Sequence, residues 1–341
     1  MKHRRLQAVL ILVLAIALTG CGGRERQTLR KVDTLLSVND YTQAFGLLQS
    51  ELAANPKSKA LRRAEILLLL RAGRVDLAYP CYREFAQKLS PNDPVLLHAL
   101  RDKNDAIRTS AAQAIGLAAD PAAVPALLRL LDDPNDNVRR TAVVSLGDLR
   151  DVHAVPALCN ALRDRWWFVR SEAATALGKL RDPRAVSPLF AVLKDTEADV
   201  VRAAQNALMA LIKEGDPALY IKNLQSTDPA VVRAAAVSLA SIHHTAATPV
   251  LLGYLGDADP KTRQQGLRGL RFGHDPATLP AIRKCLADPE LRVRGEAVIA
   301  IVSFNDKESI PTLNAMAADL KEDATLRQII AEAVTQLQKQ P

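Results

Sequence analysis

The sequence has few aromatic residues and few glycines, and both shortages argue against a β-sheet protein. Aromatic residues make up 4% of the 341 residues and glycine numbers 15, whereas strands favour aromatic side chains and tight turns favour glycine. Alanine and leucine, which have the highest helix propensities, recur throughout the chain. The composition therefore predicts an all-α protein.

Cysteine is scarce as well, and the four cysteines are not arranged for metal binding or catalysis. Cys81, Cys159 and Cys285 lie far apart along a chain that repeats itself, so no disulfide within the chain is expected. The sequence also lacks a phosphate-binding loop, a paired-cysteine cluster and a Ser/His/Asp spacing. It predicts a protein that has no cofactor, no metal and no catalytic residues.

A strong charge imbalance is absent too. The net charge is +8, and Lys2, Arg4 and Arg5 supply three of these charges, which leaves a mild excess of +5 beyond them. Such an excess suits anionic lipid headgroups or an acidic partner, although a solvated surface is its ordinary explanation. No motif interleaves basic and aromatic residues, so a nucleic-acid partner is not expected.

The N-terminus carries a targeting pattern. A basic segment over residues 2–5 precedes an apolar run over residues 6–18 that is interrupted only by Gln7. A transmembrane helix needs about 20 apolar residues, so this shorter run predicts a signal peptide over residues 1–20. The sequence Leu-Thr-Gly-Cys follows over residues 18–21 and resembles the lipobox of bacterial lipoproteins.

In that family the cysteine, here Cys21, is acylated and becomes the first residue of the mature chain. Several acyl chains hold a protein stably on a bilayer, and residues 21–26 would form a short lipidated tether. Gly22 stands where the family's signal for inner-membrane retention has aspartate. The resemblance therefore implies an outer-membrane lipoprotein that faces the periplasm. The alternative is an ordinary secretory signal followed by an unmodified cysteine.

Most of the remaining chain repeats with a period of 31 residues. One apolar column consists of Ile115, Leu146, Leu177, Leu208, Leu239, Leu270 and Ile301. A small residue stands four positions before each member, which places both columns on one helical face. A turn column reads Asp102, Asp133, Asp164, Asp195, Ser226, Asp257, Asp288 and Asp319. Each unit is predicted to be two antiparallel helices, for example residues 122–131 and 137–149, and the units to stack as an α-solenoid.

These units resemble HEAT repeats, in particular the short variant named after phycobilisome lyases. The matching residues are Pro-Ala-Leu-x-x-x-Leu-x-Asp over residues 125–133 and Val-Arg-x-x-Ala-x-x-x-Leu-Gly over residues 138–147. The resemblance covers residues 93–338, about eight units. It implies that the arginine after the valine pairs with the turn aspartate of the same or the next unit. Arg108, Arg139, Arg170, Arg263 and Arg294 hold that place, and Val201 and Val232 interrupt it.

Residues 27–92 keep a different period of 34 residues. Ala44 and Ala78 are one such pair, and Leu48 and Tyr82 are another. This segment resembles two tetratricopeptide repeats, although the usual large aromatic residue of the first helix is missing. Because both repeat types bury their faces against neighbouring units, we expect the two segments to form one superhelix of antiparallel helix pairs.

Trp166, Trp167 and Phe168 are the first candidates for binding. They stand at the turn between the helices of the third unit, where other units place polar residues such as Asn135 and Asp259. Tryptophan is enriched among interface hot spots, so the three rings are predicted to contact a partner. The alternatives are rings that fold over a neighbouring turn or that touch a lipid surface.

A stripe of Arg140, Arg202 and Arg233 is the second candidate. These residues occupy one column of the second helix, on the face that lines the concave side in the HEAT family. The stripe is predicted to bind an acidic peptide or an anionic polymer, although each arginine alone has the ordinary explanation of a solvated charge. Arg202 and Arg233 follow Val201 and Val232, a displacement expected to free them for the surface.

HEAT-like relatives include a di-iron hydroxylase and the bilin lyases. The hydroxylase holds its metal with His-Glu pairs, and this sequence contains no such pair. His243 and His274 share one column, but nothing else supports a metal clip there, and polar link residues explain them. We predict a non-enzymatic, membrane-anchored scaffold of the bacterial envelope that binds a protein partner and is otherwise monomeric. The alternative is an accessory or lyase-like factor that acts on a bound cofactor or substrate.

Overall fold

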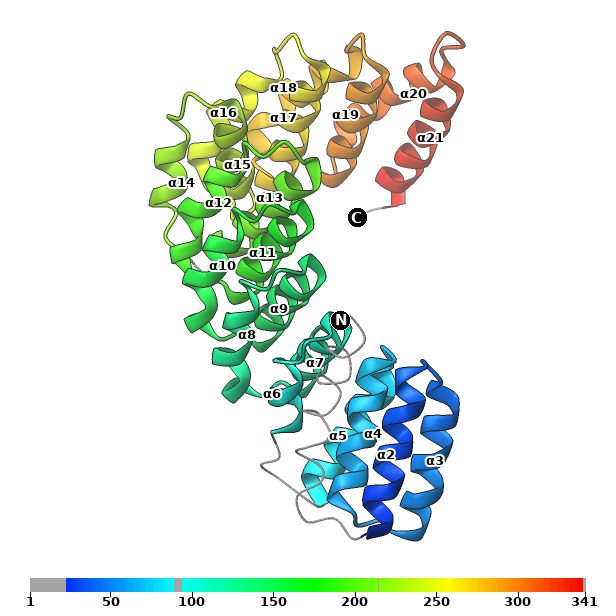
Figure 1. The fold of residues 1–341 in the computed structure, drawn as a ribbon. Helices are drawn as coiled ribbons and strands as arrows, with labels where there is room; N and C mark the ends of the chain where they lie inside the picture. The colour runs from blue at the N-terminus through cyan, green and yellow to red at the C-terminus, as the bar shows by residue number, and fades with distance from the viewer. Residues whose placement is uncertain (1–22, 89–93, 214, 340–341) are drawn as a thin grey trace. The chain divides into compact units, whose positions relative to one another are not determined.

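The computed structural model describes residues 23–88, 94–213 and 215–339, which form helices and turns without a strand (Figure 1). The predicted all-α class is therefore confirmed. The chain divides into two compact units, Met1–Leu180 and Arg181–Pro341. The predicted signal peptide and Cys21 lie outside the described residues. None of the described helices has the length and apolar character that crossing a bilayer requires.

The first compact unit begins with two antiparallel helix pairs. The helices are α2 (Gly23–Ser37), α3 (Tyr41–Ala54), α4 (Lys59–Arg71) and α5 (Val75–Lys88). The turn inside each pair contains one left-handed residue, Asn39 with φ +60° or Gly73 with φ +70°. These two residues are separated by the 34-residue period, so the repeat in sequence corresponds to a repeat in turn geometry. That the pairs are tetratricopeptide repeats stays a prediction.

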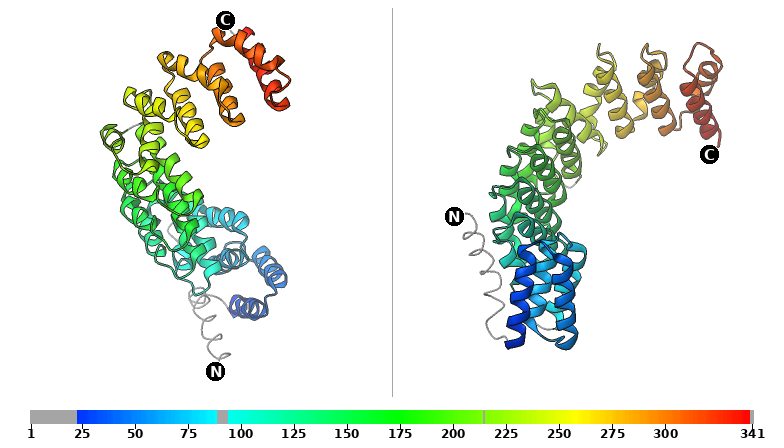
Figure 2. Two further views of the ribbon diagram at one scale, coloured as in Figure 1. Left: turned by 90° about the horizontal axis from the view of Figure 1, so that it is seen from above. Right: turned by 45° about the vertical axis from the view of Figure 1, so that its right-hand side comes forward.

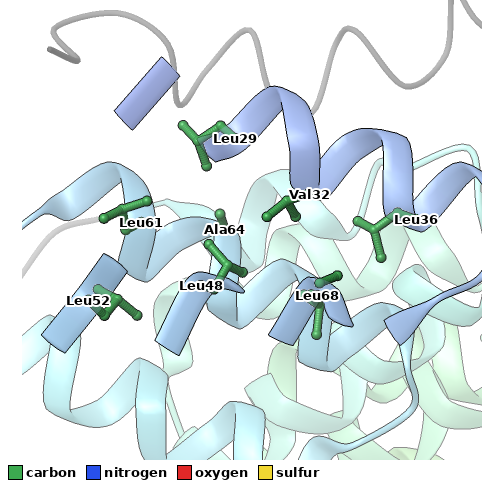
Figure 3. Packing of buried hydrophobic residues seen from close by; sticks show 9 residues of the cluster. Leu29, Val32, Leu36, Leu48, Leu52, Leu61, Ala64 and Leu68 are labelled. Carbon is green, nitrogen blue, oxygen red and sulfur yellow. The ribbon is translucent and has the colours of Figure 1, made fainter. Parts of the chain in front are cut away.

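Leucines on α2, α3 and α4 form the core of this segment. Figure 3 shows Leu29 and Leu36 of α2 on the same side of their helix, facing Leu48 of α3 and Leu68 of α4. Leu29 and Leu48 are fully buried. Because α2 buries only this side, its opposite side is left to solvent.

The rest of the first compact unit consists of repeats, each with one short and one long helix. The short helices are α6 (Val95–Ala99), α8 (Val124–Leu130) and α10 (Val155–Ala161), and the long ones are α7 (Asp105–Ala118), α9 (Asp136–Leu149) and α11 (Trp167–Leu180). The long helices α7, α9 and α11 pack side by side (Figure 1). This is the predicted arrangement of stacked helix pairs.

The predicted first helix over residues 122–131 is in fact a 3-10 turn followed by a short α-helix. The turn is η1 (Pro121–Ala123), and η2 (Val152–Ala154) repeats it before α10. Pro125 has no N–H to donate to the carbonyl four residues earlier. The Val124 N–H donates to the Pro121 carbonyl instead, across three residues, which is the 3-10 pattern.

The second compact unit consists of further pairs of one short and one long helix, which Figure 2 shows from two further sides. Its short helices are α12 (Val186–Val192), α14 (Ala218–Asn223), α16 (Thr248–Tyr254), α18 (Leu279–Lys284) and α20 (Ile310–Ala318). Its long helices are α13 (Ala198–Ile212), α15 (Pro229–Ala240), α17 (Pro260–Gly273), α19 (Leu291–Ser303) and α21 (Ala324–Lys339). Five 3-10 turns complete it: η3 (Pro183–Ala185), η4 (Thr245–Ala247), η5 (Pro276–Thr278), η6 (Cys285–Ala287) and η7 (Lys307–Ser309).

The predicted columns of apolar and small residues form the core of both compact units. Every member of the column from Ile115 to Ile301 is at most 3% exposed. The alanines four positions earlier are fully buried. Helices approach closely at small residues, since a Cβ atom added to Gly147 of α9 would lie 2.8 Å from the Cβ atom of Ala176 on α11. The stacking register predicted from the period is therefore correct.

The long helices end in a way that the sequence pattern did not reveal. A left-handed residue follows most of them, in a column of Ala119, Arg150, Arg181, His243, His274 and Asn305 with φ between +47° and +57°. Histidine and asparagine adopt this conformation more readily than alanine or arginine. None of the six is glycine, so no residue type announced the turn.

Candidate functional site

Arginine and aspartate side chains fix the turn between the two helices of a unit. Arg108 donates from Nε and Nη2 to the carboxylate of Asp133 in the next unit, at 2.7 and 2.9 Å. Its Nη1 donates to the carbonyl of Asp102 in its own unit at 2.8 Å. Burial of Asp133 disfavours its ionisation, but the hydrogen bonds from Arg108 and from the Asn135 amide outweigh this and hold its pKa below the ordinary value. One arginine thus joins two consecutive turns.

The same pairing recurs along the chain. Two-pronged pairs form between Arg139 and Asp164 and between Arg263 and Asp288. Arg294 pairs with Glu322, which replaces Asp319 in the last unit. The family resemblance left open whether the partner lies in the same or the next unit. In these pairs the two-pronged carboxylate belongs to the next unit. The arginine's own unit contributes carbonyl oxygens and, for Arg139, also the carboxylate of Asp136.

This ladder also holds the turn that carries the aromatic residues. Asp164 Oδ1 accepts the N–H of Trp166 at 2.8 Å, just as Asp133 Oδ1 accepts the N–H of Asn135 at 2.9 Å. The backbone at Trp166 is therefore held as in the preceding unit. The two units differ here in their side chains.

Trp166 occupies the position that caps the following helix. In four other units the side chain at this position, Asn104, Asn135, Asp228 or Asp259, accepts a backbone N–H of the first turn of the long helix. Glu197 and Glu290 hold the position in two further units and make no such hydrogen bond. The indole ring has one donor and no acceptor, so Trp166 cannot cap α11. An asparagine or aspartate at such a position contributes about 1 kcal/mol. The third unit lacks this cap and carries an aromatic ring in its place.

The three aromatic rings form one cluster. The rings of Trp167 and Phe168 are stacked with centroids 3.6 Å apart, and the Trp166 and Phe168 centroids are 5.2 Å apart. All three residues were predicted to lie in the turn, but α11 already begins at Trp167, so Trp167 and Phe168 are its first two residues. Phe168 is 40% exposed, and both tryptophans are half-buried. Phe168 is thus the most accessible ring of this aromatic cluster.

Arg140 lies beside the helix that carries the cluster. It belongs to α9, and its Nη1 is 3.9 Å from Oε1 of Glu172 on α11. Glu172 follows Phe168 by four residues, which is one helical turn. The Nε atom of Arg140 is buried and has no hydrogen-bond partner in the part of the chain that the structure describes. Arg140 therefore pairs with a residue of α11 that lies one helical turn beyond Phe168.

A pocket of about 260 Å³ opens between α8 and α10. Leu128 and Ala157 contribute apolar walls, and Asp132 and Arg163 contribute charges. Asp164, which holds the Trp166 amide, also lines it. Asp164 therefore contributes both to the wall of the pocket and to the turn that carries the aromatic cluster. Sequence reasoning missed this pocket, because the gap between two neighbouring helices leaves no mark on the period.

Arg202 and Arg233 belong to the second compact unit and differ in how far their side chains are exposed. The side chain of Arg202 is 71% exposed and pairs with Asp199 of the same helix. Arg233 is half-buried, and its Nη1 donates to Oε1 of Gln265 on the next long helix at 2.7 Å. The expected release to the surface thus holds for Arg202, whereas Arg233 is tied to its neighbour because its displacement turns it toward α17. Binding by either arginine stays a prediction.

The histidine column makes contacts between consecutive units. His243 Nδ1 lies 3.0 Å from the carbonyl oxygen of Gly273, and the His274 ring stacks on Phe304 with centroids 4.4 Å apart. Among the described residues no group of three or more His, Cys, Asp or Glu could hold a metal ion. Cys285 is buried, and burial raises the pKa of its thiol.

Solved structures share this fold at low sequence identity. Importin beta aligns with 97% of this chain at 16% identity and a TM-score of 0.55, and the chain spans 46% of importin beta. Kap95p, described as binding RanGDP, aligns with 97% of the chain at 15% identity and a TM-score of 0.51, over 50% of its own length. The CpcE and CpcF complex of phycocyanin lyase from Nostoc sp. PCC7120 aligns with 71% at 22% identity and a TM-score of 0.36, over 93% of its own length.

The family itself is identified from the sequence of the repeats. No curated protein sequence matches significantly. The family model for HEAT repeats, in contrast, matches residues 94–174, 130–209 and 249–335, which together exceed half of the chain. These ranges include the ladder and the aromatic cluster. The chain belongs to the HEAT-repeat family.

Proposed function

We propose that this chain is a non-enzymatic scaffold, anchored by lipid in the bacterial envelope, that binds a protein partner through the aromatic cluster. The observation that carries the proposal is Trp166 at a helix-capping position. Trp166 contributes no capping hydrogen bond, and its ring lies together with those of Trp167 and Phe168. This arrangement suits recognition of a partner better than stability of the fold. The exposed Phe168 offers the partner an anchor, and the pocket between α8 and α10 offers a cavity for an apolar side chain.

The fold supports the same proposal in general terms. Stacked repeats present extended surfaces that suit protein ligands, and Kap95p, which shares the fold, is described as binding RanGDP. Function still depends on the site and not on the fold. The proposal therefore depends on the aromatic cluster, and its test concerns those residues.

Crosslinking and affinity capture from solubilised envelopes test the partner contact. Replacing Phe168 by serine should reduce capture of the crosslinked protein about thirtyfold, because a hot-spot aromatic contributes 2 kcal/mol or more. Asn137 occupies the same position in the preceding unit and is exposed, so Asn137→Ser is the matched control and should leave capture unchanged. Equal capture by both variants would contradict the proposal. Quenching of the tryptophans by brominated lipid would assign the rings to the bilayer instead.

The lipid anchor is tested separately. Cys21→Ser removes the thiol that acylation needs, so the variant should leave the membrane fraction, while the parent protein stays there. A clickable fatty acid fed to the cells should label the parent protein and not the variant. A variant that remains wholly in the membrane fraction would count against the anchor and would leave the partner contact untouched.

A further inference from the structure

The solvent side of α2 carries positive charge only. Its exposed positions between Gly23 and Ser37 hold four basic side chains and no acidic one: Arg24, Arg26, Arg30 and Lys31. The two acidic residues of the helix, Glu25 and Asp33, are partly buried. The name "basic face" is used below for these four residues.

Three of the four charges have no carboxylate partner among the described residues. Arg24 Nε pairs with Glu51 at 3.0 Å, and Glu25 accepts a hydrogen bond from Asn55 at 2.7 Å. Within the described part of the chain, Arg26, Arg30 and Lys31 form no ion pair. They are available to an external anion.

The remaining exposed positions of α2 favour a diffuse anionic surface over a folded protein. They are Gly23, Gln27, Thr34 and Ser37, so the face offers no apolar or aromatic side chain. Protein interfaces depend on a few buried anchors of that kind. A layer of anionic headgroups needs only positive charge, and each Lys or Arg near it contributes about 1 kcal/mol.

The position of α2 in the chain brings it next to such a layer. The helix begins at Gly23, two residues after Cys21. Two residues span at most about 7 Å, so lipid attached to Cys21 would hold the start of α2 at the bilayer surface. We propose that the basic face of α2 binds the anionic phospholipid headgroups of the membrane that holds the acylated Cys21. This inference rests on the proposed anchor and adds to it a surface that orients the first compact unit on the membrane.

A vesicle-binding assay without the acyl chain tests the basic face alone. The mature chain, residues 21–341 with Cys21→Ser, contains every described helix. It should sediment with vesicles of phosphatidylcholine and phosphatidylglycerol and not with phosphatidylcholine alone, and high salt should release it. Replacing Arg26, Arg30 and Lys31 together by glutamine should lower the partition coefficient about a hundredfold, since each charge is worth about fivefold. Glutamine has a helix propensity close to theirs, so α2 should persist.

The matched control removes three charges elsewhere. The second compact unit exposes three basic residues on other helices: Lys222, Lys261 and Arg292. Their replacement by glutamine should leave the partition coefficient unchanged. The single change Arg30→Gln, with an expected fivefold loss, keeps the test valid if the triple variant unfolds. Equal partition of both triple variants, or equal binding to neutral vesicles, would overturn the inference. Failure of the anchor would appear only in the Cys21→Ser fractionation, because this assay contains no acylated protein.

Discussion

The ring of Phe168 stacks on the ring of Trp167 with their centroids 3.6 Å apart and their planes 24° from parallel. Both residues belong to the first turn of α11, and the preceding unit has Asp136 and Asn137 at these positions. A stacked aromatic pair is stiff, so little conformational entropy is lost when a partner covers it. Under the proposed function, the stack would therefore be preorganised for the partner.

The capping position of Trp166 gives the first prediction. Trp166→Asn and Trp166→Ala both remove the ring, but only asparagine can accept a backbone N–H of α11. We expect the asparagine variant to be more stable than the alanine variant by about 1 kcal/mol in chemical denaturation. Partner capture should fall equally in both.

The preceding unit supplies the control, because Asn135 accepts the N–H groups of Asn137 and Val138. Asn135→Ala should cost about 1 kcal/mol without affecting capture. If the two Trp166 variants were equally stable, the position would not act as a cap.

The ladder gives a second prediction. The side chain of Arg108 is 12% exposed and that of Asp133 is 7% exposed. Arg108→Met would leave a buried carboxylate without its partner and should cost about 3 kcal/mol of unfolding free energy. Arg202→Met breaks a pair that lies on the surface and should cost less than about 1 kcal/mol. Urea denaturation followed by circular dichroism measures both, and equal losses would show that the ladder is not structural.

Acid should destabilise the protein through the same carboxylates. The folded-state pKa of Asp133 lies below its ordinary value, because the hydrogen bonds from Arg108 and the Asn135 amide outweigh burial. The resulting stability is fully present above the unfolded pKa of about 3.9 and is lost as the pH falls through the lower folded pKa.

Unfolding free energies measured from pH 6 downward should therefore decrease below about pH 4. Arg108→Met removes the main cause of the depressed pKa of Asp133, so its acid loss should be smaller than that of the parent protein. An identical pH dependence would show that Asp133 does not contribute.

The buried column gives the last prediction. Leu177 on α11 is fully buried, so Leu177→Ala should leave a cavity and cost about 2–5 kcal/mol. Glu197 is exposed and makes no side-chain capping hydrogen bond to α13, so Glu197→Ala should change stability little. Melting temperatures that agree for the two variants would contradict the assigned core.

Local periodicity explains what the sequence alone determined. The 31-residue spacing of Ile115, Leu146 and Leu177 predicted the helices, the buried face and the stacking register, because one helical face recurs at fixed intervals. Trp166 was noticed because it broke a polar column. Its capping position could not be assigned, since helix ends are poorly defined by sequence.

Only the tertiary structure decided which side chains meet across units. Arg108 reaches Asp133, 25 residues away, and Arg233 reaches Gln265, 32 residues away. Such contacts depend on the rotation of one helix against the next, and a shift of one residue turns a side chain by about 100°. The left-handed turns at Ala119 and Arg150 likewise follow from where each long helix must end to pack on its neighbour, a demand that outweighs the residues' own backbone preference.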